Sequence, residues 1–136
     1  MKLLGIDYGM KRIGLATTDE SQTIATPLLT IQNKGDKKNI IALSEIVKSH
    51  DIKGIVFGIP QNSSGEDTPM TKIVRDFGNK LSAELGMEVV FVNERYSSKE
   101  AEDHIRENLG ITKREKIAEL IDKMSASLIL KSYIEK

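Results

Sequence analysis

Two acidic residues follow apolar segments that are typical of buried β-strands, and their placement is what could do chemistry. Asp7 ends the apolar run 3–6, and Glu94 follows the apolar run 87–92 after a single residue. Ligands of open α/β sheets bind beyond the carboxyl ends of the strands. If the first strand is parallel to the later ones, both acids lie at one edge of the sheet. Because neighbouring carboxylates repel each other, such a pair indicates a cation between them.

A third acidic residue, Asp122, lies at the edge of the apolar face of a C-terminal helix. Apolar residues recur there at helical spacing between positions 117 and 128. The neighbours of Asp122 on that side are mostly small: Ala118, Ser125, Ala126 and Ile129. Small side chains would let the helix backbone approach the sheet closely, so that a short acidic side chain points into the same crevice.

Each of the three acids also has a simpler interpretation, which the sequence leaves open. Asp7 and Glu94 can begin a turn or cap a helix, as acidic residues between elements often do. Asp122 can be a solvated acid that pairs with a lysine of its own helix. The lysines within reach are Lys113, Lys116 and Lys123.

Three carboxylates around one crevice form the oxygen donor set that Mg²⁺ or Mn²⁺ prefers. Two such ions about 4 Å apart can hold the attacking and leaving oxygens of a phosphodiester. Basic residues that could hold phosphate groups outside the metal centre, or be ordinary solvated charges, follow two of the acids. They are Lys11, Arg12 and Arg95. Ser64 precedes an expected helix N-terminus, where an anion such as a phosphate can also bind.

The elements that must position these residues alternate between strands and helices after an initial antiparallel meander. Apolar patterning predicts strands over about 2–7, 12–18, 23–31, 53–59 and 87–92. It predicts helices over about 37–50, 69–85, 97–108 and 113–133. The order β-β-β-α-β-α-β-α-α contains two β-α-β crossovers, which make the later strands parallel. We therefore expect an α/β fold, a five-stranded mixed sheet with helices on both faces, in one domain over residues 1–136.

The composition narrows the classes of protein further. Basic and acidic residues both number 20, cysteine is absent and aromatic residues make up 4% of the chain. A net charge of zero argues against strong non-specific nucleic-acid binding, although a basic rim around an acidic site remains possible in this balance. The absence of cysteine excludes disulfides and thiolate metal sites and fits a reducing, cytoplasmic location. No apolar run approaches the ~20 residues that span a bilayer, so we expect no membrane association.

Four segments resemble, in order, the motifs of the YqgF family. The segments are 7–16 (DYGMKRIGLA), 58–65 (GIPQNSSG), 93–98 (NERYSS) and 121–126 (IDKMSA). The family is described as pre-16S rRNA nucleases and as Holliday junction resolvase-like proteins, with an RNase H-like fold. The resemblance covers essentially the whole chain. Asn93 stands where the family usually has Asp, and Met10 stands where it has a small polar residue.

The resemblance implies that Asp7, Glu94 and Asp122 are the catalytic carboxylates. In the two-metal hydrolysis that it implies, Asp7 bridges two Mg²⁺ or Mn²⁺ ions, and the other two acids hold one ion each. Lys11, Arg12, Arg95 and Ser64 would orient the phosphates of the substrate. The two departures from the family pattern do not involve this triad.

The implied function is a cytoplasmic endonuclease that matures the 5′ end of 16S rRNA, with a structured rRNA precursor or a ribosomal particle as its partner. Three alternatives stay open. A resolvase of four-way DNA junctions would cut two strands symmetrically and should be a homodimer. A non-catalytic nucleic-acid-binding factor would assist ribosome assembly or transcription. An ATP-binding domain of the actin and sugar-kinase type would need a second domain. The sequence does not choose between a monomer and a homodimer, or between RNA and DNA.

Overall fold

The computed structural model describes residues 1–60, 65–93 and 114–135, which form one sheet and the helices that cover it. The strands are β1 (Lys2–Tyr8), β2 (Arg12–Thr18), β3 (Ala25–Gln32), β4 (Ile52–Ile59) and β5 (Val89–Asn93). The helices in this part of the chain are α1 (Asp36–Ser49), α2 (Pro69–Leu85) and α4 (Arg114–Ile134). The predicted helix over 97–108 lies outside the described residues.

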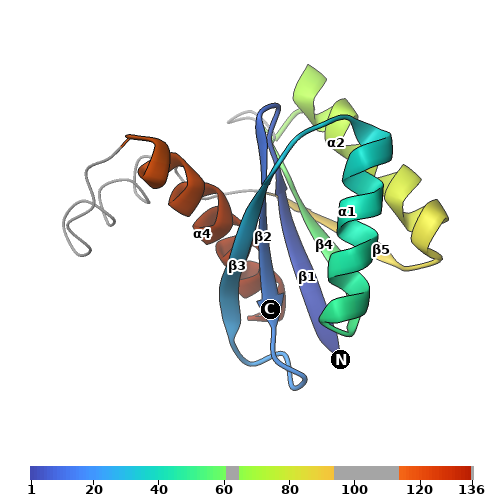
Figure 1. Ribbon diagram of the computed structural model, residues 1–136, viewed down its shortest axis with the longest axis vertical. Helices are drawn as coiled ribbons and strands as arrows, with labels where there is room; N and C mark the ends of the chain where they lie inside the picture. The colour runs from blue at the N-terminus through green and yellow to red at the C-terminus, as the bar shows by residue number, and fades with distance from the viewer. Residues whose placement is uncertain (61–64, 94–113, 136) are drawn as a thin grey trace.

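The five strands form one mixed sheet in the order β3-β2-β1-β4-β5 (Figure 1). β1 pairs with β2, and β2 with β3, in antiparallel orientation. β1 pairs with β4, and β4 with β5, in parallel orientation. The first strand is therefore parallel to the later two, which meets the condition set by the sequence, and the carboxyl ends of β1, β4 and β5 meet at one edge of the sheet.

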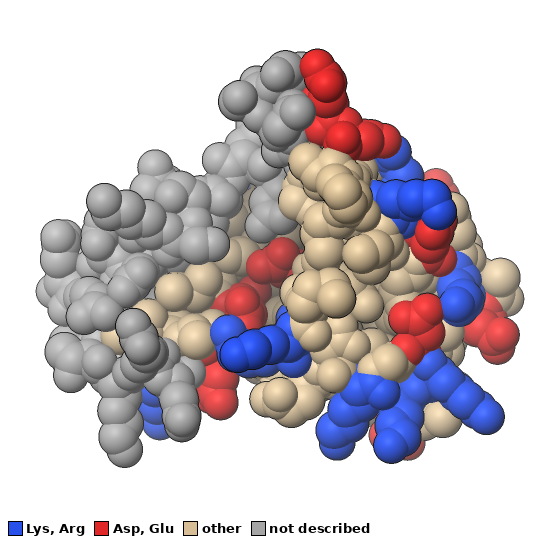
Figure 2. All heavy atoms as spheres, turned by 90° about the horizontal axis from the view of Figure 1, so that it is seen from above, with Lys and Arg blue, Asp and Glu red and all other residues tan. Residues whose placement is uncertain are grey.

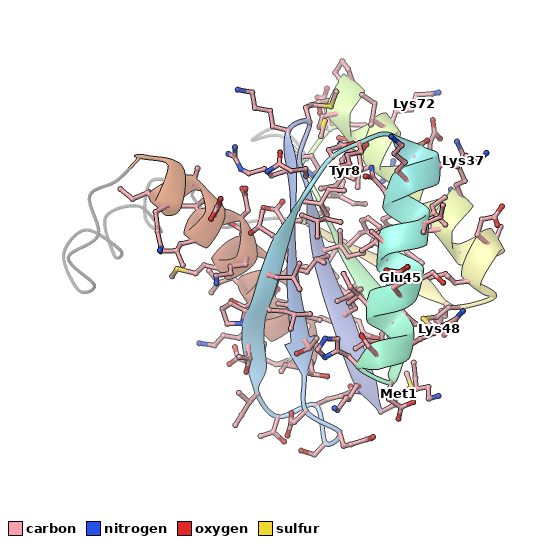
Figure 3. All side chains as sticks on the ribbon, viewed as in Figure 1. Met1, Tyr8, Lys37, Glu45, Lys48 and Lys72 are labelled. Atoms are coloured by element: carbon pink, nitrogen blue, oxygen red, sulfur yellow. The ribbon has the colours of Figure 1, made fainter. Side chains whose placement is uncertain are left out.

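Helices cover both faces of the sheet, as predicted (Figure 1). α1 and α2 lie on one face, where large apolar side chains of β1, β2 and β4 pack against Leu43, Phe77 and Leu81. α4 covers the other face, and its Ala126, Ile129 and Leu130 pack there against Leu3, Ala16 and Val56. Side chains alternate between the faces along a strand. Because Ile6 and Tyr8 belong to the first face, Asp7 is on the α4 face. Figure 3 shows Tyr8 on the side of α1.

Two strands begin later than their patterning predicts, because hydrogen bonds engage their first residues elsewhere. Thr23 and Ile24 donate their backbone N–H groups to Asp19 Oδ1 at 2.8 and 2.9 Å, so β3 begins at Ala25. The backbone N–H of Met87 donates to the carbonyl of Ser82 at 3.2 Å and so caps the end of α2, and β5 begins at Val89.

The limits of α2 follow from its terminal residues. Thr68 Oγ1 accepts a hydrogen bond from Thr71 N at 3.3 Å, and Thr71 Oγ1 accepts one from Thr68 N at 2.9 Å, which completes a capping box. Pro69 occupies the first helical position. Gly86 ends the helix in the left-handed region at φ 60°, as predicted. Within the described part of the chain, no helix combines the length and apolarity needed to cross a membrane.

Candidate active site

Asp7 lies at the open edge of the sheet, on a strand that is held from both sides. It is the last residue but one of β1, is partly buried, and pairs with Gly14 of β2. On the other side, the pairing of β1 with β4 ends one residue earlier, at Ile6 and Phe57. The strand therefore fixes the backbone of Asp7 while its carboxylate projects from the α4 face.

Close contact between α4 and β2 brings Asp122 to the same place. A Cβ atom added to Gly14 would lie 2.0 Å from the carbonyl oxygen of Asp122, a distance that no side chain could tolerate. Further along the helix, a Cβ added to Gly5 would lie 2.8 Å from the carbonyl oxygen of Ala126. The expected close approach of this helix is confirmed. Because Gly14 also pairs with Asp7, the backbone of Asp122 lies over the strand next to Asp7.

The Asp122 carboxylate is engaged by Arg12, a residue of β2 on the same face as Gly14. Arg12 Nε donates to Asp122 Oδ2 at 2.7 Å, and the two side chains are 30% and 22% exposed. An ionised pair at this distance and burial is a charge-assisted hydrogen bond that restrains both side chains. Among the described residues, the cation on Asp122 is therefore a strand arginine and not Lys116 or Lys123 of its own helix.

The turn that joins Asp7 to Arg12 is fixed by residues that sequence reasoning did not single out. Gly9 N donates to the carbonyl of Arg12 at 2.9 Å and closes the turn. Asn33, which follows β3, donates from its backbone N–H to the Lys11 carbonyl at 2.9 Å and from Nδ2 to the Gly9 carbonyl at 2.9 Å. Asn33 therefore binds the turn at two points.

Asn33 is held in turn by Asn39 of α1. Asn39 Nδ2 donates to Asn33 Oδ1 at 2.9 Å, and Asn39 is only 1% exposed. Buried amides are found where every polar atom has a partner. The one signal in the sequence is that Asn39 stands four residues before Leu43 on the predicted helix, but the pattern does not indicate its partner.

Three of the predicted site residues, Ser64, Glu94 and Arg95, lie outside the described residues. β5 ends at Asn93, which pairs with Ile59 at the same edge as Asp7, and Glu94 is the next residue in the sequence. The structure thus brings together Asp7, Arg12 and Asp122, with Lys11 exposed on the adjoining turn. The role of Glu94 stays a prediction.

The view onto this edge shows acidic side chains recessed in a hollow, with basic side chains beside them (Figure 2).

A family model described as "RuvX: Holliday junction resolvase" matches residues 1–136. The chain belongs to the RuvX family. This is the family called YqgF in the sequence analysis, so the predicted family membership is confirmed.

Two relatives within this family match over almost their whole length. A protein of Endomicrobium trichonymphae named "Putative pre-16S rRNA nuclease" is 40% identical over 98% of this chain and 95% of its own. A protein of the same name from Caldanaerobacter subterraneus subsp. tengcongensis is 38% identical over 99% of this chain and 96% of its own. Both relatives thus carry the name of a nuclease.

Solved structures identify the fold. Thermus thermophilus RuvC in complex with a Holliday junction substrate covers 100% of this chain and 97% of its own, with a TM-score of 0.61 at 14% identity. A Fowlpox virus resolvase with Holliday junction DNA gives a TM-score of 0.59 at 16% identity and covers 99% and 97%. At these identities the likeness shows the fold alone, which is RuvC-like and RNase H-like, as predicted.

The donor set of this RuvX site fits a hard divalent cation, the kind on which RuvC-like nucleases usually depend. Asp7 and Asp122 offer only carboxylate oxygens, the ligands that Mg²⁺ and Mn²⁺ take. Residues 1–60, 65–93 and 114–135 contain no group of three or more acidic, histidine or cysteine residues placed to hold a metal. Asp7 and Asp122, two of the three predicted ligands, lie in that part, and the third, Glu94, lies outside it.

Proposed function

We propose that this RuvX chain is a metal-dependent endonuclease that hydrolyses phosphodiester bonds during 5′-end maturation of pre-16S rRNA. The observation that supports it most is the approach of α4 to Gly14, which carries Asp122 to the strand beside Asp7. A carboxylate on a strand end and another on a crossing helix form a preorganised acidic site at the edge where α/β sheets bind ligands. The choice of RNA is supported by the names of the relatives.

In this proposal, each residue of the site has one task. Asp7, Glu94 and Asp122 would hold one or two Mg²⁺ or Mn²⁺ ions, which supply Lewis-acid activation of the phosphodiester when bound. Asp7 is held rigidly because its backbone belongs to a central strand. Arg12 fixes the orientation of the Asp122 carboxylate through the 2.7 Å hydrogen bond.

Arg12 and Lys11 would also attract the phosphates of the substrate. A guanidinium carries five N–H donors, and the bond to Asp122 uses only the one on Nε. Lys11 is exposed on the turn that joins Asp7 to Arg12, so its ammonium group is accessible at the same edge. Arg95 and Ser64 are proposed for the same task from the sequence.

Cleavage of four-way DNA junctions is a second candidate for the same site. The family description names a Holliday junction resolvase, and the RuvC fold has been seen with such a junction. Two carboxylates and a metal would cleave either backbone, so the acidic site does not choose between substrates. A junction resolvase should be a two-fold dimer in solution. A homodimer at working concentration would favour this candidate over an rRNA nuclease acting as a monomer.

The decisive experiment compares the wild type with Asp7→Asn and Asp122→Asn on two substrates, a 16S rRNA precursor fragment and a four-way DNA junction. Each reaction is run with Mg²⁺, with Mn²⁺ and with EDTA. We expect the wild type to cleave the RNA only with metal, and each variant to be slower by at least about 100-fold, since each removes a carboxylate that would hold the metal ion.

The matched control is Asp51→Asn, which removes an exposed carboxylate paired with Lys53 at the start of β4. It should cleave like the wild type. Cleavage by Asp7→Asn at the wild-type rate would refute the proposed site. Metal-independent binding of RNA without any cleavage by the wild type would favour a non-catalytic role in ribosome assembly.

A further inference from the structure

Four lysines gather at the same edge of the sheet as Asp7, and we call them the lysine patch. They are Lys11, Lys34, Lys37 and Lys38, and all four are exposed. Lys11 belongs to the turn between β1 and β2. The other three lie between the end of β3 and the first turn of α1. The patch therefore joins two segments that are more than twenty residues apart in the sequence.

Hydrogen bonds hold these two segments against each other. Asn33 N donates to the Lys11 carbonyl at 2.9 Å, so the residue before Lys34 contacts the turn directly. Lys34 N donates to Asn39 Oδ1 at 3.0 Å, and Asn39 Nδ2 donates to Asn33 Oδ1 at 2.9 Å. Because Asn39 is buried in α1, the backbone that carries the patch is fixed to the core.

The positive charge of the patch is not neutralised by its own segment. The acid within the stretch, Asp36, is paired with Lys80 of α2 at 2.9 Å. The hydrogen bond to Asp36 raises the pKa of Lys80. None of the four patch lysines forms an ion pair with an acid among the residues that the structure describes.

This local excess stands out because the whole chain has no net charge. Exposed like charges repel one another only weakly in water and salt, but four of them on neighbouring segments create a positive local potential that attracts a polyanion. Figure 2 looks onto the edge where β1 ends, and several basic side chains gather along one side of that view. In Figure 3, Lys37 lies at the end of α1 near this edge and Lys48 at the opposite end.

We propose that the lysine patch binds the phosphate backbone of the nucleic acid next to the bond that is cleaved. This inference rests on the proposed function, because it takes the acidic site as the place of cleavage. Lysine ammonium groups bind phosphates as point charges. Such contacts position a nucleic acid without reading its bases, so the patch binds the backbone irrespective of sequence. Each phosphate that it neutralises releases counterions, which makes the affinity depend on salt.

The test compares two triple variants with the same change of charge. The patch variant carries Lys34→Gln, Lys37→Gln and Lys38→Gln. The control variant carries Lys48→Gln, Lys53→Gln and Lys131→Gln, exposed residues of the last turn of α1, the start of β4 and the last turn of α4. Binding of a labelled 16S rRNA precursor fragment is measured by fluorescence anisotropy in EDTA, where no cleavage occurs, between about 50 and 200 mM salt.

We expect the patch variant to bind about tenfold or more weakly at low salt. The slope of log affinity against log salt should be smaller by about 2 to 3, since each lost phosphate contact removes about 0.7 to 0.9. The control variant should match the wild type in both quantities. In cleavage assays with metal, the patch variant should show a raised KM and an unchanged kcat.

Two results would overturn the inference. One is an unchanged affinity and slope in the patch variant, and the other is an equal loss in both triple variants, which would trace binding to total charge. Neither result would contradict the proposed function, provided that the wild type still cleaves one of the two substrates. Conversely, a wild type that cleaves neither substrate, yet binds RNA through the patch, would refute the proposed function and leave the patch in place.

Discussion

The two faces of the sheet are built from side chains of very different size. On the face of α1 and α2, aromatic and branched side chains fill the space, and the rings of Phe57 and Phe77 meet edge to face with centroids 6.1 Å apart. On the face of α4, the strands carry small residues where the helix crosses them: Gly5, Gly14 and Ala16. Because these residues have little or no side chain, the backbone of α4 packs directly against the strands.

The two faces of the sheet therefore contribute in different ways, one mainly to stability and the other to the position of Asp122. Large buried side chains remove much apolar surface from water, so the α1 and α2 face contributes most of the hydrophobic stability. The α4 face buries less, but its glycines bring a helix close enough for Asp122 to share a site with Asp7. Stability and the placement of the proposed catalytic groups should therefore respond to different substitutions.

The largest expected effect on stability comes from the α1 and α2 face. Leu81 of α2 is fully buried, so Leu81→Ala leaves a cavity and should lower the free energy of unfolding by about 2–5 kcal/mol. Urea denaturation measures this loss. The fraction that remains folded should cleave RNA at the wild-type rate per molecule. A fall in kcat greater than the unfolded fraction explains would mean that the two faces are not independent.

The second prediction concerns the α4 face. Gly14→Ala adds a methyl group where the Asp122 carbonyl would be 2.0 Å away, so α4 must move off β2. We expect a loss of about 1–3 kcal/mol in unfolding free energy from overpacking. We also expect a loss of cleavage well beyond the loss of folded protein, because Asp122 moves with its helix.

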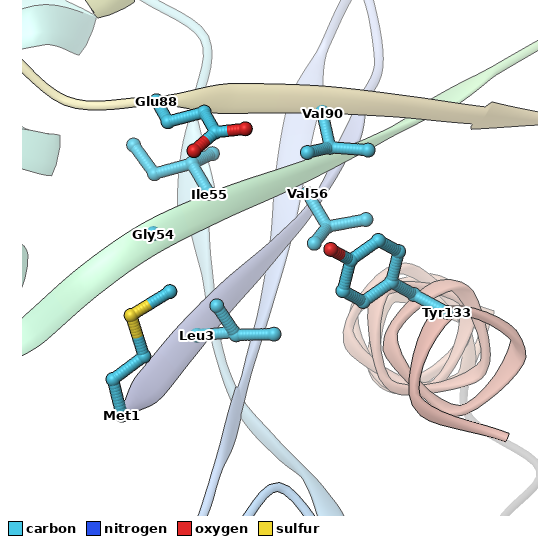
Figure 4. A pocket seen from close by; sticks show the side chains of 8 residues that line it. All are labelled: Met1, Leu3, Gly54, Ile55, Val56, Glu88, Val90 and Tyr133. Atoms are coloured by element: carbon cyan, nitrogen blue, oxygen red, sulfur yellow. The ribbon is translucent and has the colours of Figure 1, made fainter. Parts of the chain in front are cut away.

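Gly54→Ala is the matched control for Gly14→Ala. Gly54 lines a small pocket near the amino ends of β1 and β4, far from Asp7, together with Leu3 and Met1 (Figure 4). A Cβ there would lie 2.8 Å from Leu3 Cδ2, the end of a side chain that can rotate away. This variant should cleave like the wild type. Equal losses of activity in both glycine variants would contradict a special role for the contact of α4 with Gly14.

A smaller effect is expected from the ion pair that crosses the α4 face. Arg12→Gln removes the hydrogen bond to Asp122, in which both side chains are less than one third exposed. We expect about 1 kcal/mol of destabilisation, as for hydrogen bonds to charged groups that are partly buried. A double-mutant cycle with Asp122→Asn should give a coupling energy of about 0.5–1.5 kcal/mol. Strict additivity of the two substitutions would show that the pair contributes nothing.

The smallest expected effect on stability comes from a turn residue that belongs to neither face of the sheet. Asp19, in the turn between β2 and β3, accepts hydrogen bonds from Ile24, Ser21 and Thr23, which lower its pKa from 3.8 to about 2. Since the folded pKa is the lower one, ionised Asp19 stabilises the fold above about pH 4, and this stabilisation disappears as the pH falls to about 2. The Tm difference between wild type and Asp19→Asn should narrow over that window. Parallel Tm curves would refute the assignment.

Most of the fold could be predicted from local patterns. The limits of β2 and α2 follow from apolar spacing, the Thr68 cap and Gly86, because these signals act within a few residues. Two strand starts were wrong by two residues, since the competing hydrogen bonds come from Asp19 and from the end of α2. These bonds span only four or five residues, but apolar patterning does not indicate them.

The candidate site could be predicted only in part. Asp7 and Asp122 were identified from a strand end and the phase of a helix, and the structure places the backbone of Asp122 over β2, next to Asp7 on β1. The bond from Arg12 to Asp122 spans 110 residues, and no periodicity in the sequence indicates it. The support of the turn by Asn33 and Asn39 was missed for the same reason.

Residue types and spacing were thus enough to select an acidic site on a mixed sheet, because strand periodicity, helix phase and turn residues are local properties. Long-range packing decided the rest: the order β3-β2-β1-β4-β5, the partner of Asp122, and the meeting of Lys11 with Lys34, Lys37 and Lys38. These features arise when distant segments close around a shared core. Each of them joins residues that are close in space but far apart along the chain, so local sequence patterns do not indicate them.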